Sequence, residues 1–291
     1  MIAQNTRLGI LMMLSATLVF AAQDAISRYM AEQYPVLMVV MIRYWAFAAF
    51  VVVIAVRSAG GLRHAVATRQ PGVQILRGLL LAGQICLMVL SFVTLGLAAA
   101  HAVFTAYPLI VAALSGPLLG EKVGWRRWTA ILVGFAGILV ILQPGGGVWQ
   151  PAALIPLAAA TGFALYSLLT RYVARDDSAA VSFFWTGVTG AVVMTGAGIW
   201  VWVPMAPPDM GWMAVLCCTG ILGHWLVIRC YEVAEASAVQ PFAYVQLVWA
   251  TTLGVLLFDE TLYANTVVGA VLVVAAGLFT LWRQRQLGTG G

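Results

Sequence analysis

Ten long apolar stretches, separated by short polar connections, make up most of the chain and decide what it can fold into. A helix needs about 20 mostly apolar residues to cross a bilayer, and each stretch approaches that length. Hydrophobic types make up 63% of the 291 residues and charged types only 9%, so a soluble fold could not cover its surface with polar groups. We therefore expect an all-α polytopic membrane protein in contact with the lipid bilayer. The predicted spans are 8–31, 35–57, 73–96, 100–119, 125–142, 151–173, 179–202, 210–233, 237–258 and 263–282.

The distribution of basic residues predicts the orientation of these spans. If the N-terminus lies in the cytoplasm, Lys and Arg gather in the inner connections, and the outer connections hold few, with Arg28 as the main exception. Cytoplasmic connections of membrane proteins carry this excess of positive charge. We expect a multi-pass protein of the bacterial inner (plasma) membrane with both termini in the cytoplasm. In this setting the net charge of +5 does not indicate a nucleic acid, and none is expected as a partner.

An internal repeat relates the two halves of the chain. The segment "LSATLVFAAQDAISRYMA" (14–31) aligns with "LAAATGFALYSLLTRYVA" (157–174). In this alignment Phe20, Arg28 and Tyr29 meet Phe163, Arg171 and Tyr172. Near the end of each half, Glu121 meets Glu260. Because the matched positions include charged residues, the similarity goes beyond that of two apolar helices.

The repeat predicts one membrane domain built from two five-helix units. The first covers residues 1–145 and the second residues 146–291, joined at "QPGGGVWQP". Five is an odd number, so the second unit must enter the membrane from the opposite side. Inverted repeats of this kind are typical of secondary transporters, in which they enclose a central site near the midplane that opens to either side.

Several segments resemble one family. "LLGEKVGWRRWTAILVGFAGILVIL" (118–142), its partner "LFDETLYANTVVGAVLVVAAGLFTL" (257–281) and the five-plus-five layout resemble the EamA-type branch of the drug/metabolite transporter superfamily. The resemblance implies a basket-shaped bundle with a central cavity and with the fifth and tenth helices at the periphery. It also implies a carrier of small metabolites, such as amino acids exported from the cell. "DAISRY" and "IRYW" further resemble uptake members for substrates like S-adenosylmethionine.

Asp24 is the only acidic residue that we place well inside the hydrocarbon. A charge there is costly, so it should face a cavity or a partner. Arg28, one helical turn further on, and Arg43, on the next span, are the candidate partners. Three interpretations stay open for Asp24: a structural ion pair, a polar pair on the cavity wall that contacts or steers substrate, and an acid that couples transport to protons.

Other polar residues are candidates for the cavity wall or for joining helices. His101 opens the fourth span at the outer face, where it could simply be solvated. His224 lies much deeper and could titrate during proton coupling. Gln84 and Gln246 are uncharged groups within spans, suited either to hydrogen-bonding varied solutes or to helix packing.

Aromatic and proline residues complete the candidate site. The aromatic residues expected along the cavity wall are Tyr107, Tyr166, Trp185, Tyr244 and Trp249. Pro108 and Pro241 interrupt the fourth and ninth spans near their starts and are candidate gating hinges, because proline frees a backbone carbonyl and allows a bend.

The chain lacks HExxH, GxSxG and P-loop motifs, and paired carboxylates at one membrane depth are not evident. Its four Cys fall in apolar stretches without CxxC spacing. We therefore expect neither catalytic residues nor a metal or cofactor. The main prediction is an alternating-access secondary transporter that exports small metabolites, above all amino acids with broad specificity. The alternative is an uptake carrier for S-adenosylmethionine, riboflavin or nucleotide-like metabolites, with an intramembrane enzyme or a channel less favoured. Proton coupling is left open.

Overall fold

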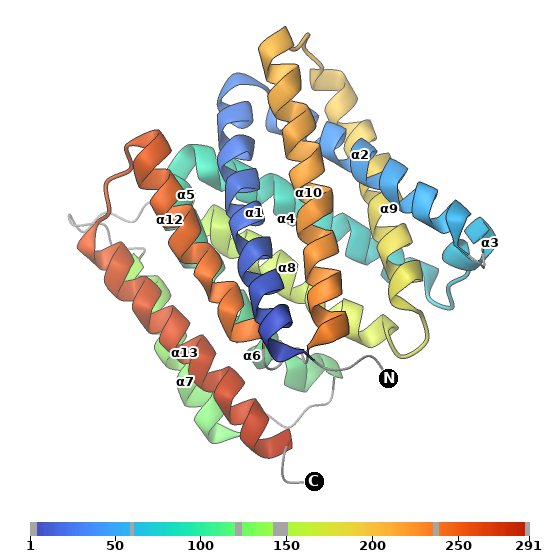
Figure 1. The fold of residues 1–291 in the computed structure, drawn as a ribbon. Helices are drawn as coiled ribbons and strands as arrows, with labels where there is room; N and C mark the ends of the chain where they lie inside the picture. Colours follow the sequence, from blue (N-terminus) through green and yellow to red (C-terminus); the bar gives the residue numbers. More distant parts are fainter. Residues whose placement is uncertain (1–4, 59–60, 120–123, 142–150, 235–238, 289–291) are drawn as a thin grey trace.

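A computed structural model describes residues 5–58, 61–119, 124–141, 151–234 and 239–288. The described residues form helices joined by short connections, and no strand occurs among them (Figure 1). The helices are α1 Thr6–Gln33, α2 Val36–Arg57, α3 Gly61–Val66, α4 Pro71–Leu95, α5 Leu97–Phe104, α6 Tyr107–Leu119, α7 Trp125–Ile141, α8 Leu154–Val173, α9 Ala179–Gly198, α10 Pro207–Val233, α12 Val245–Phe258 and α13 Ala264–Gly288, with 3₁₀ helices η1 Pro151–Ala153, η2 Ile199–Val201 and η3 Gln240–Tyr244.

The lengths of these helices agree with a polytopic membrane protein. Seven helical segments of the described chain are long and apolar enough to cross a membrane, and three shorter apolar helices accompany them. Large apolar side chains such as Leu11, Val192 and Leu256 are exposed on the outside of the bundle. This is the expected arrangement for a surface that lipid rather than water covers.

Local sequence signals set several helix ends. The side chain of Asn5 accepts a hydrogen bond from the Leu8 N–H at 3.0 Å and so caps α1. Pro35 separates α1 from α2, because the residue before a proline is pushed away from the helical conformation. Gly96, with φ of +87°, separates α4 from α5 in a backbone region that favours glycine.

The fourth and ninth spans are interrupted, as the two prolines predict. The fourth divides into α5 and α6, and Pro108 lies in the first turn of α6, where a missing N–H costs little. In the ninth, the 3₁₀ helix η3 contains Pro241 and leads into α12. The interruptions are confirmed, and the hinge function remains a prediction.

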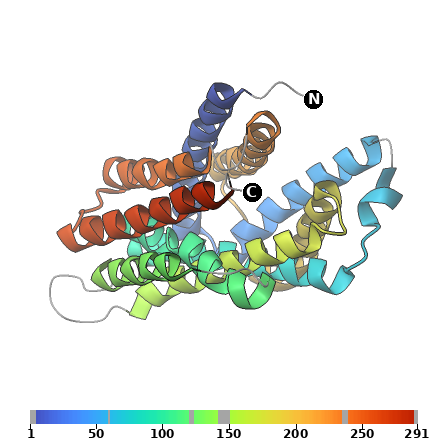
Figure 2. The same cartoon turned by 90° about the horizontal axis from the view of Figure 1, so that it is seen from below.

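The helices pack mainly in pairs that join distant parts of the chain. The most extensive pairings are α1 with α10, α4 with α8, α2 with α9, and α7 with α13. The α7–α13 pair lies at one edge of the bundle in Figures 1 and 2. A Cβ at Gly137 would lie 2.9 Å from the Gly269 carbonyl oxygen, so glycine permits this close approach. The peripheral place of α7 and α13 matches the arrangement that the family resemblance implies.

Figure 1 also defines the two ends of the bundle used below. Its upper end holds the α1–α2, α9–α10 and α12–α13 connections, and its lower end holds both termini and the α8–α9 connection. The predicted boundary at 145/146 lies within 142–150, and these residues are outside the described part of the chain. Glu121 is also outside it. The division into 1–145 and 146–291 therefore stays a prediction.

Candidate functional site

A cavity, called here the Arg43 cavity, lies between α1, α2, α4 and α10. Helical spacing brings its residues together, since Arg43 and Phe47 are one turn apart on α2 and Gly220 and His224 are one turn apart on α10. Its full lining is Gln23, Val40, Arg43, Tyr44, Phe47, Leu81, Ile85, Leu216, Cys217, Gly220, Ile221 and His224. The wall is mostly apolar with a few polar groups, the usual composition of a small-molecule site.

Two polar atoms of this cavity's residues lack a protein partner. Gln23 Oε1 and the Tyr44 hydroxyl are buried, and neither has a hydrogen-bond partner in the described part of the chain. Buried polar groups are normally paired, and leaving one unpaired costs about 1–3 kcal/mol. A bound solute with a complementary donor and acceptor would remove this cost.

The guanidinium of Arg43 adds positive charge and further donors. Its Nη1 donates to Ser27 Oγ at 3.3 Å, the single hydrogen bond that Arg43 makes within the described residues. A guanidinium has five N–H groups in a planar fork that suits carbonyl and carboxylate oxygens. Arg43 also interacts electrostatically with Asp24 on α1, although the two do not form an ion pair.

His224 lies among aromatic rings on the exposed side of the Arg43 cavity. Its ring centroid is 5.5 Å from that of Phe20, 5.7 Å from that of Phe47 and 6.1 Å from that of Phe183. Of these four rings, Phe47 and His224 line the cavity, and a ring of a solute can pack against them.

A second cavity, called here the Tyr107 cavity, lies beside the broken fourth and ninth spans. Its lining is His101, Phe104, Thr105, Tyr107, Pro108, Ala243, Tyr244, Gln246 and Leu247. The Tyr244 hydroxyl is buried and lacks a hydrogen-bond partner among the described residues. Pro108, Tyr107, Tyr244 and Gln246, four of the predicted site residues, thus meet at one place.

Asp24 contacts residues that the sequence did not indicate as its partners. Its Oδ2 lies 3.1 Å from His101 Nε2 and 3.2 Å from Gln246 Nε2. We call these three residues the Asp24 cluster. Neither candidate partner forms an ion pair with Asp24 within the described chain, because Arg28 pairs with Glu32 and Glu260 and Arg43 donates to Ser27.

The environment of His101 also corrects the expectation that it is solvated. The residue is only 3% exposed, and its ring stacks on Phe92 with centroids 5.3 Å apart and planes 3° apart. The α4–α5 break at Gly96 turns α5 so that His101 faces α1. A helix continuing straight from α4 would have carried it elsewhere.

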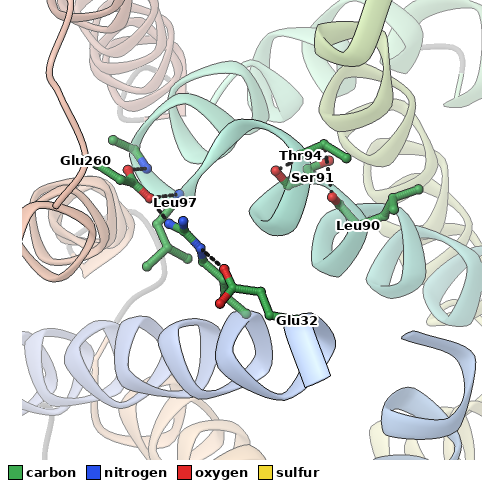
Figure 3. A network of polar contacts seen from close by, with 8 residues as sticks. Glu32, Leu90, Ser91, Thr94, Leu97 and Glu260 are labelled. Carbon is green, nitrogen blue, oxygen red and sulfur yellow. Dashed lines mark hydrogen bonds and ion pairs between the residues drawn. The ribbon is translucent and has the colours of Figure 1, made fainter. Parts of the chain in front are cut away.

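Arg28 belongs to a charged contact at the upper end, called here the Glu260 junction (Figure 3). Its guanidinium pairs with Glu32 at 3.0 Å and with Glu260, and it lies over the Phe258 ring at 4.1 Å. Glu260 also accepts hydrogen bonds from the backbone N–H groups of Leu97 at 2.6 Å and Ala98 at 3.0 Å. The acid thus lies at the positive N-terminus of α5.

Glu260 lies in the connection between α12 and α13. The carboxylate reaches α5, more than 160 residues earlier in the chain. Gly96 allows this approach, since a Cβ there would lie 2.6 Å from Glu260 Oε1. The junction therefore ties together α1, the α4–α5 break and the α12–α13 connection.

Besides Asp24, four predicted cavity residues line neither the Arg43 cavity nor the Tyr107 cavity. Trp185 donates from Nε1 to the carbonyl of Val66, the last residue of α3, at 3.2 Å, and its place on a substrate path stays a prediction. Tyr166 lies 5.1 Å from the guanidinium of Arg77 on α4. Gln84 and Trp249 each bury a polar atom, Oε1 and Nε1, without a hydrogen-bond partner in the described residues.

A network at the lower end was missed by the sequence reasoning. The Asp177 carboxylate accepts hydrogen bonds from Thr68 Oγ1, from Gln74 Nε2 at 2.8 Å and from the Arg69 N–H at 3.2 Å. Burial acts to raise the pKa of Asp177, but these hydrogen bonds and the charge of Arg69 outweigh it, so the pKa lies below its ordinary value. The buried Arg77 donates to Gln74 and Thr170. An arginine inside an apolar span was the sequence signal that could have indicated this network.

Metal chemistry has no evident centre in the parts of the chain that the structure describes. No group of three or more His, Cys, Asp or Glu side chains gathers there in a way that could hold a metal ion. The polar features that the described residues offer include the Arg43 and Tyr107 cavities and the contacts around them.

The sequence matches known transporters along almost its whole length. The model of the EamA-like transporter family matches twice, at residues 7–143 and 150–282. A riboflavin transporter of Vibrio cholerae serotype O1 is 30% identical over 288 residues, covering 96% of this chain and 94% of that protein. An S-adenosylmethionine uptake transporter of Rickettsia prowazekii is 25% identical, with the same coverage of each chain.

A solved crystal structure shares the fold. It superposes with a TM-score of 0.61 at 20% sequence identity and covers 96% of this chain and 98% of the other. The relatives are named as transporters of riboflavin and S-adenosylmethionine, and these names do not support amino-acid export. From the two family matches and the whole-length relatives, the chain belongs to the EamA-like transporter family.

Proposed function

We propose that the protein is a secondary carrier that takes up a flat heteroaromatic metabolite, riboflavin or a close analogue, and binds it in the Arg43 cavity. The observation that carries this proposal is the cavity itself, in which Gln23 Oε1 and the Tyr44 hydroxyl lack protein partners and Arg43 has spare N–H donors. The edge of a flavin ring carries carbonyl oxygens and an N–H that complement these groups.

The charge of the cavity disfavours a solute that carries a positive group. Arg43 lies in its wall, and none of the described lining residues has a carboxylate. An amino-acid zwitterion needs both signs of charge, and S-adenosylmethionine brings a sulfonium that Arg43 would repel. Riboflavin is uncharged and can stack against the Phe47 and His224 rings. The names of the relatives agree with uptake of such metabolites, so S-adenosylmethionine is the second candidate.

The helix pairings support two inverted five-helix repeats, 1–145 and 146–291. Exchanging each helix with its counterpart in the other half turns the α1–α10 pair into the α8–α4 pair and returns α2–α9 and α7–α13 to themselves. The family model also matches each half separately. With α5 and α6 counted as one interrupted span, this gives ten spans around a central site and an alternating-access mechanism.

In the bacterial inner membrane, we place the lower end and both termini in the cytoplasm, where the basic connections lie. The Glu260 junction then closes the periplasmic end, since it joins three separate segments. Opening to the periplasm requires α1 to part from α5 and the α12–α13 connection. The helix breaks beside Pro108 and Pro241 are the places where the fourth and ninth spans can bend.

Counterflow in proteoliposomes tests this function. Vesicles containing the purified chain are loaded with unlabelled riboflavin and diluted into a trace of labelled riboflavin, and we expect labelled riboflavin to accumulate transiently. Parallel vesicles loaded with S-adenosylmethionine or with an amino-acid panel are compared. Exchange of an amino acid, with none of riboflavin or S-adenosylmethionine, would overturn the proposal.

Matched variants connect this activity to the cavity. Arg43→Gln should abolish most of the exchange, whereas Arg57→Gln, at the exposed end of the same helix, should leave it intact. Equal activity of the two variants would place the substrate elsewhere.

A further inference from the structure

The two nitrogens of His101 both face oxygen atoms, and this fixes where its protons must be. Nδ1 lies 3.1 Å from the Leu97 carbonyl oxygen, which can only accept, so Nδ1 carries a hydrogen and donates it. Nε2 lies 3.1 Å from Asp24 Oδ2. An ionised carboxylate is also an acceptor only, so a proton must lie between these two atoms for the contact to be favourable.

Two arrangements of this proton satisfy the geometry. Either His101 is an imidazolium beside an Asp24 carboxylate, or His101 is the neutral Nδ1–H tautomer and accepts from a protonated Asp24. In both, the pair as a whole is neutral. Gln246 donates to the same Asp24 oxygen at 3.2 Å, and its Nε2 also lies 3.5 Å from His101 Nε2, which can accept only in the neutral Nδ1–H tautomer.

Losing the proton would change the charge of the pair in a costly place. His101 is 3% exposed and the Asp24 side chain 15% exposed. Deprotonation would leave a carboxylate facing the lone pair of a neutral imidazole within the membrane, which is unfavourable unless a counter-charge comes close. His101 and Gln246 of this group also line the Tyr107 cavity.

The surrounding charged groups leave one candidate for that counter-charge. Arg28 on α1 and Glu260 beyond α12 already pair with each other. From α6 and η3, Tyr107 and Tyr244 contribute phenols and no positive charge. The candidate is Arg43 on α2, which lines the Arg43 cavity and interacts electrostatically with Asp24. Cys217 and His224 on α10 and Cys86 on α4 lie close to Arg43.

We propose that the Asp24–His101 pair binds one proton that crosses the membrane together with the substrate, so that the protein is a proton symporter. This inference rests on the proposed function. In the substrate-free arrangement described above the pair holds its proton, so Arg43 is free to bind substrate oxygens. When the pair loses this proton, the charge of Arg43 instead stabilises the Asp24 carboxylate, and the substrate loses its contact with the guanidinium. Each ligand thus favours binding of the other, and both leave on the cytoplasmic side.

A pH gradient across proteoliposomes tests the coupling, with the membrane potential clamped by potassium and valinomycin. With the outside about one pH unit more acidic, one-to-one symport can accumulate riboflavin up to about tenfold. We expect uphill uptake by the natural chain. Asp24→Asn and His101→Gln should keep riboflavin counterflow and lose uphill uptake, while Glu32→Gln, which removes an exposed acid from the same helix, should accumulate riboflavin normally.

The possible results separate the two proposals. Counterflow by the natural chain without any response to the pH gradient overturns the coupling and leaves the proposed function in place. Uphill uptake by Asp24→Asn equal to that of the natural chain also overturns it. Absence of riboflavin counterflow counts against the proposed function instead.

A substrate-free measurement then decides whether the pair holds a proton. Infrared difference spectra between acidic and alkaline solution should contain a carboxyl or imidazolium band that disappears in both Asp24→Asn and His101→Gln. If the bands are the same in the natural chain and in both variants, the pair does not exchange a proton and the coupling is overturned.

Discussion

The Glu260 junction and the Arg43 cavity both place an arginine inside the bundle, but they treat it in opposite ways. Arg28 has two carboxylate partners and an aromatic ring, and Glu260 is further satisfied by two backbone N–H groups. Arg43 has one neutral partner at 3.3 Å, and the Tyr44 hydroxyl beside it has none among the described residues.

This difference indicates that the Glu260 junction stabilises the fold and that the Arg43 cavity binds a solute. Satisfied buried charges contribute to a defined arrangement of helices, and removing one partner leaves the other unpaired. Unsatisfied polar groups in a cavity lower the stability of the empty protein and increase its affinity for a solute that pairs with them. Substitutions in the junction should therefore change stability, and substitutions in the cavity should change transport.

Glu260→Gln should have the largest effect. It leaves Arg28 without its buried partner and weakens the contact with the α5 N-terminus, for a loss of about 3–5 kcal/mol. Thermal melting of the detergent-solubilised protein, followed by size-exclusion chromatography, measures the loss. Glu32→Gln is the control, because Glu32 is exposed and touches the same arginine. If the two variants melt together, the junction does not hold the fold.

Arg43→Gln should act on transport rather than on melting. Hydrogen bonds to a charged group contribute about 1.5–3 kcal/mol, so riboflavin uptake efficiency (kcat/KM) should fall by about 10–100-fold. Initial uptake rates over a range of riboflavin concentrations give this ratio. If Arg43→Gln lowered the melting temperature as much as Glu260→Gln, the cavity and the junction would not differ in their effect on stability.

Tyr44→Phe sharpens the contrast at a single atom. The hydroxyl has no protein partner within the described chain, so its removal should leave the melting temperature unchanged and raise the KM for riboflavin by about 2–10-fold. Tyr34→Phe is the opposite case, since that hydroxyl donates to Asp209 at 2.7 Å and accepts from the Ala206 N–H at 3.0 Å. It should lower the melting temperature and spare uptake. The reverse pattern would contradict the assignment of Tyr44 to the substrate.

Acidification should weaken the satisfied network at the lower end, with the smallest effect of the four. The pKa of Asp177 is lowered in the folded protein. Its stabilising contribution is therefore present above the unfolded value of about 3.9 and is lost as the pH falls through the lower, folded value. Melting temperatures measured down to about pH 3.5 should fall less steeply for Asp177→Asn than for the natural chain. Parallel curves would exclude Asp177 as a source of acid sensitivity.

Most of the helices could be predicted from the sequence because each depends on its own residues. Apolar length locates the spans, and Pro35, Gly96 and Pro108 mark ends or breaks by local backbone chemistry. The family was predicted from the resemblance of segments 118–142 and 257–281, and the match to the family model confirms it. The leading substrate prediction, amino-acid export, is not supported, since a fold shared by many carriers does not fix the chemistry of its cavity.

The candidate site could be predicted only in part. Gln246 and Tyr107, two of the candidates for the cavity wall, do line one cavity. The contact of Trp185 with Val66 could not be predicted, because an aromatic residue in a span looks the same in the sequence whether it faces a cavity, a neighbour or lipid. Gln23 and Tyr44 were overlooked because nothing in their local sequence indicates that a polar atom will lack a partner.

The amino-acid sequence by itself determined that this chain forms apolar helices in a membrane, where they break, and that an acid and several arginines lie among them. Hydrophobicity and backbone preference act over a few residues, so they can be read along the chain. Only the tertiary structure decided that Asp24 meets His101 and Gln246, and that Arg28 meets Glu260. These partners lie 77 to 232 positions apart. Their meeting depends on how the helices pack and on the turn at Gly96, which no local pattern specifies.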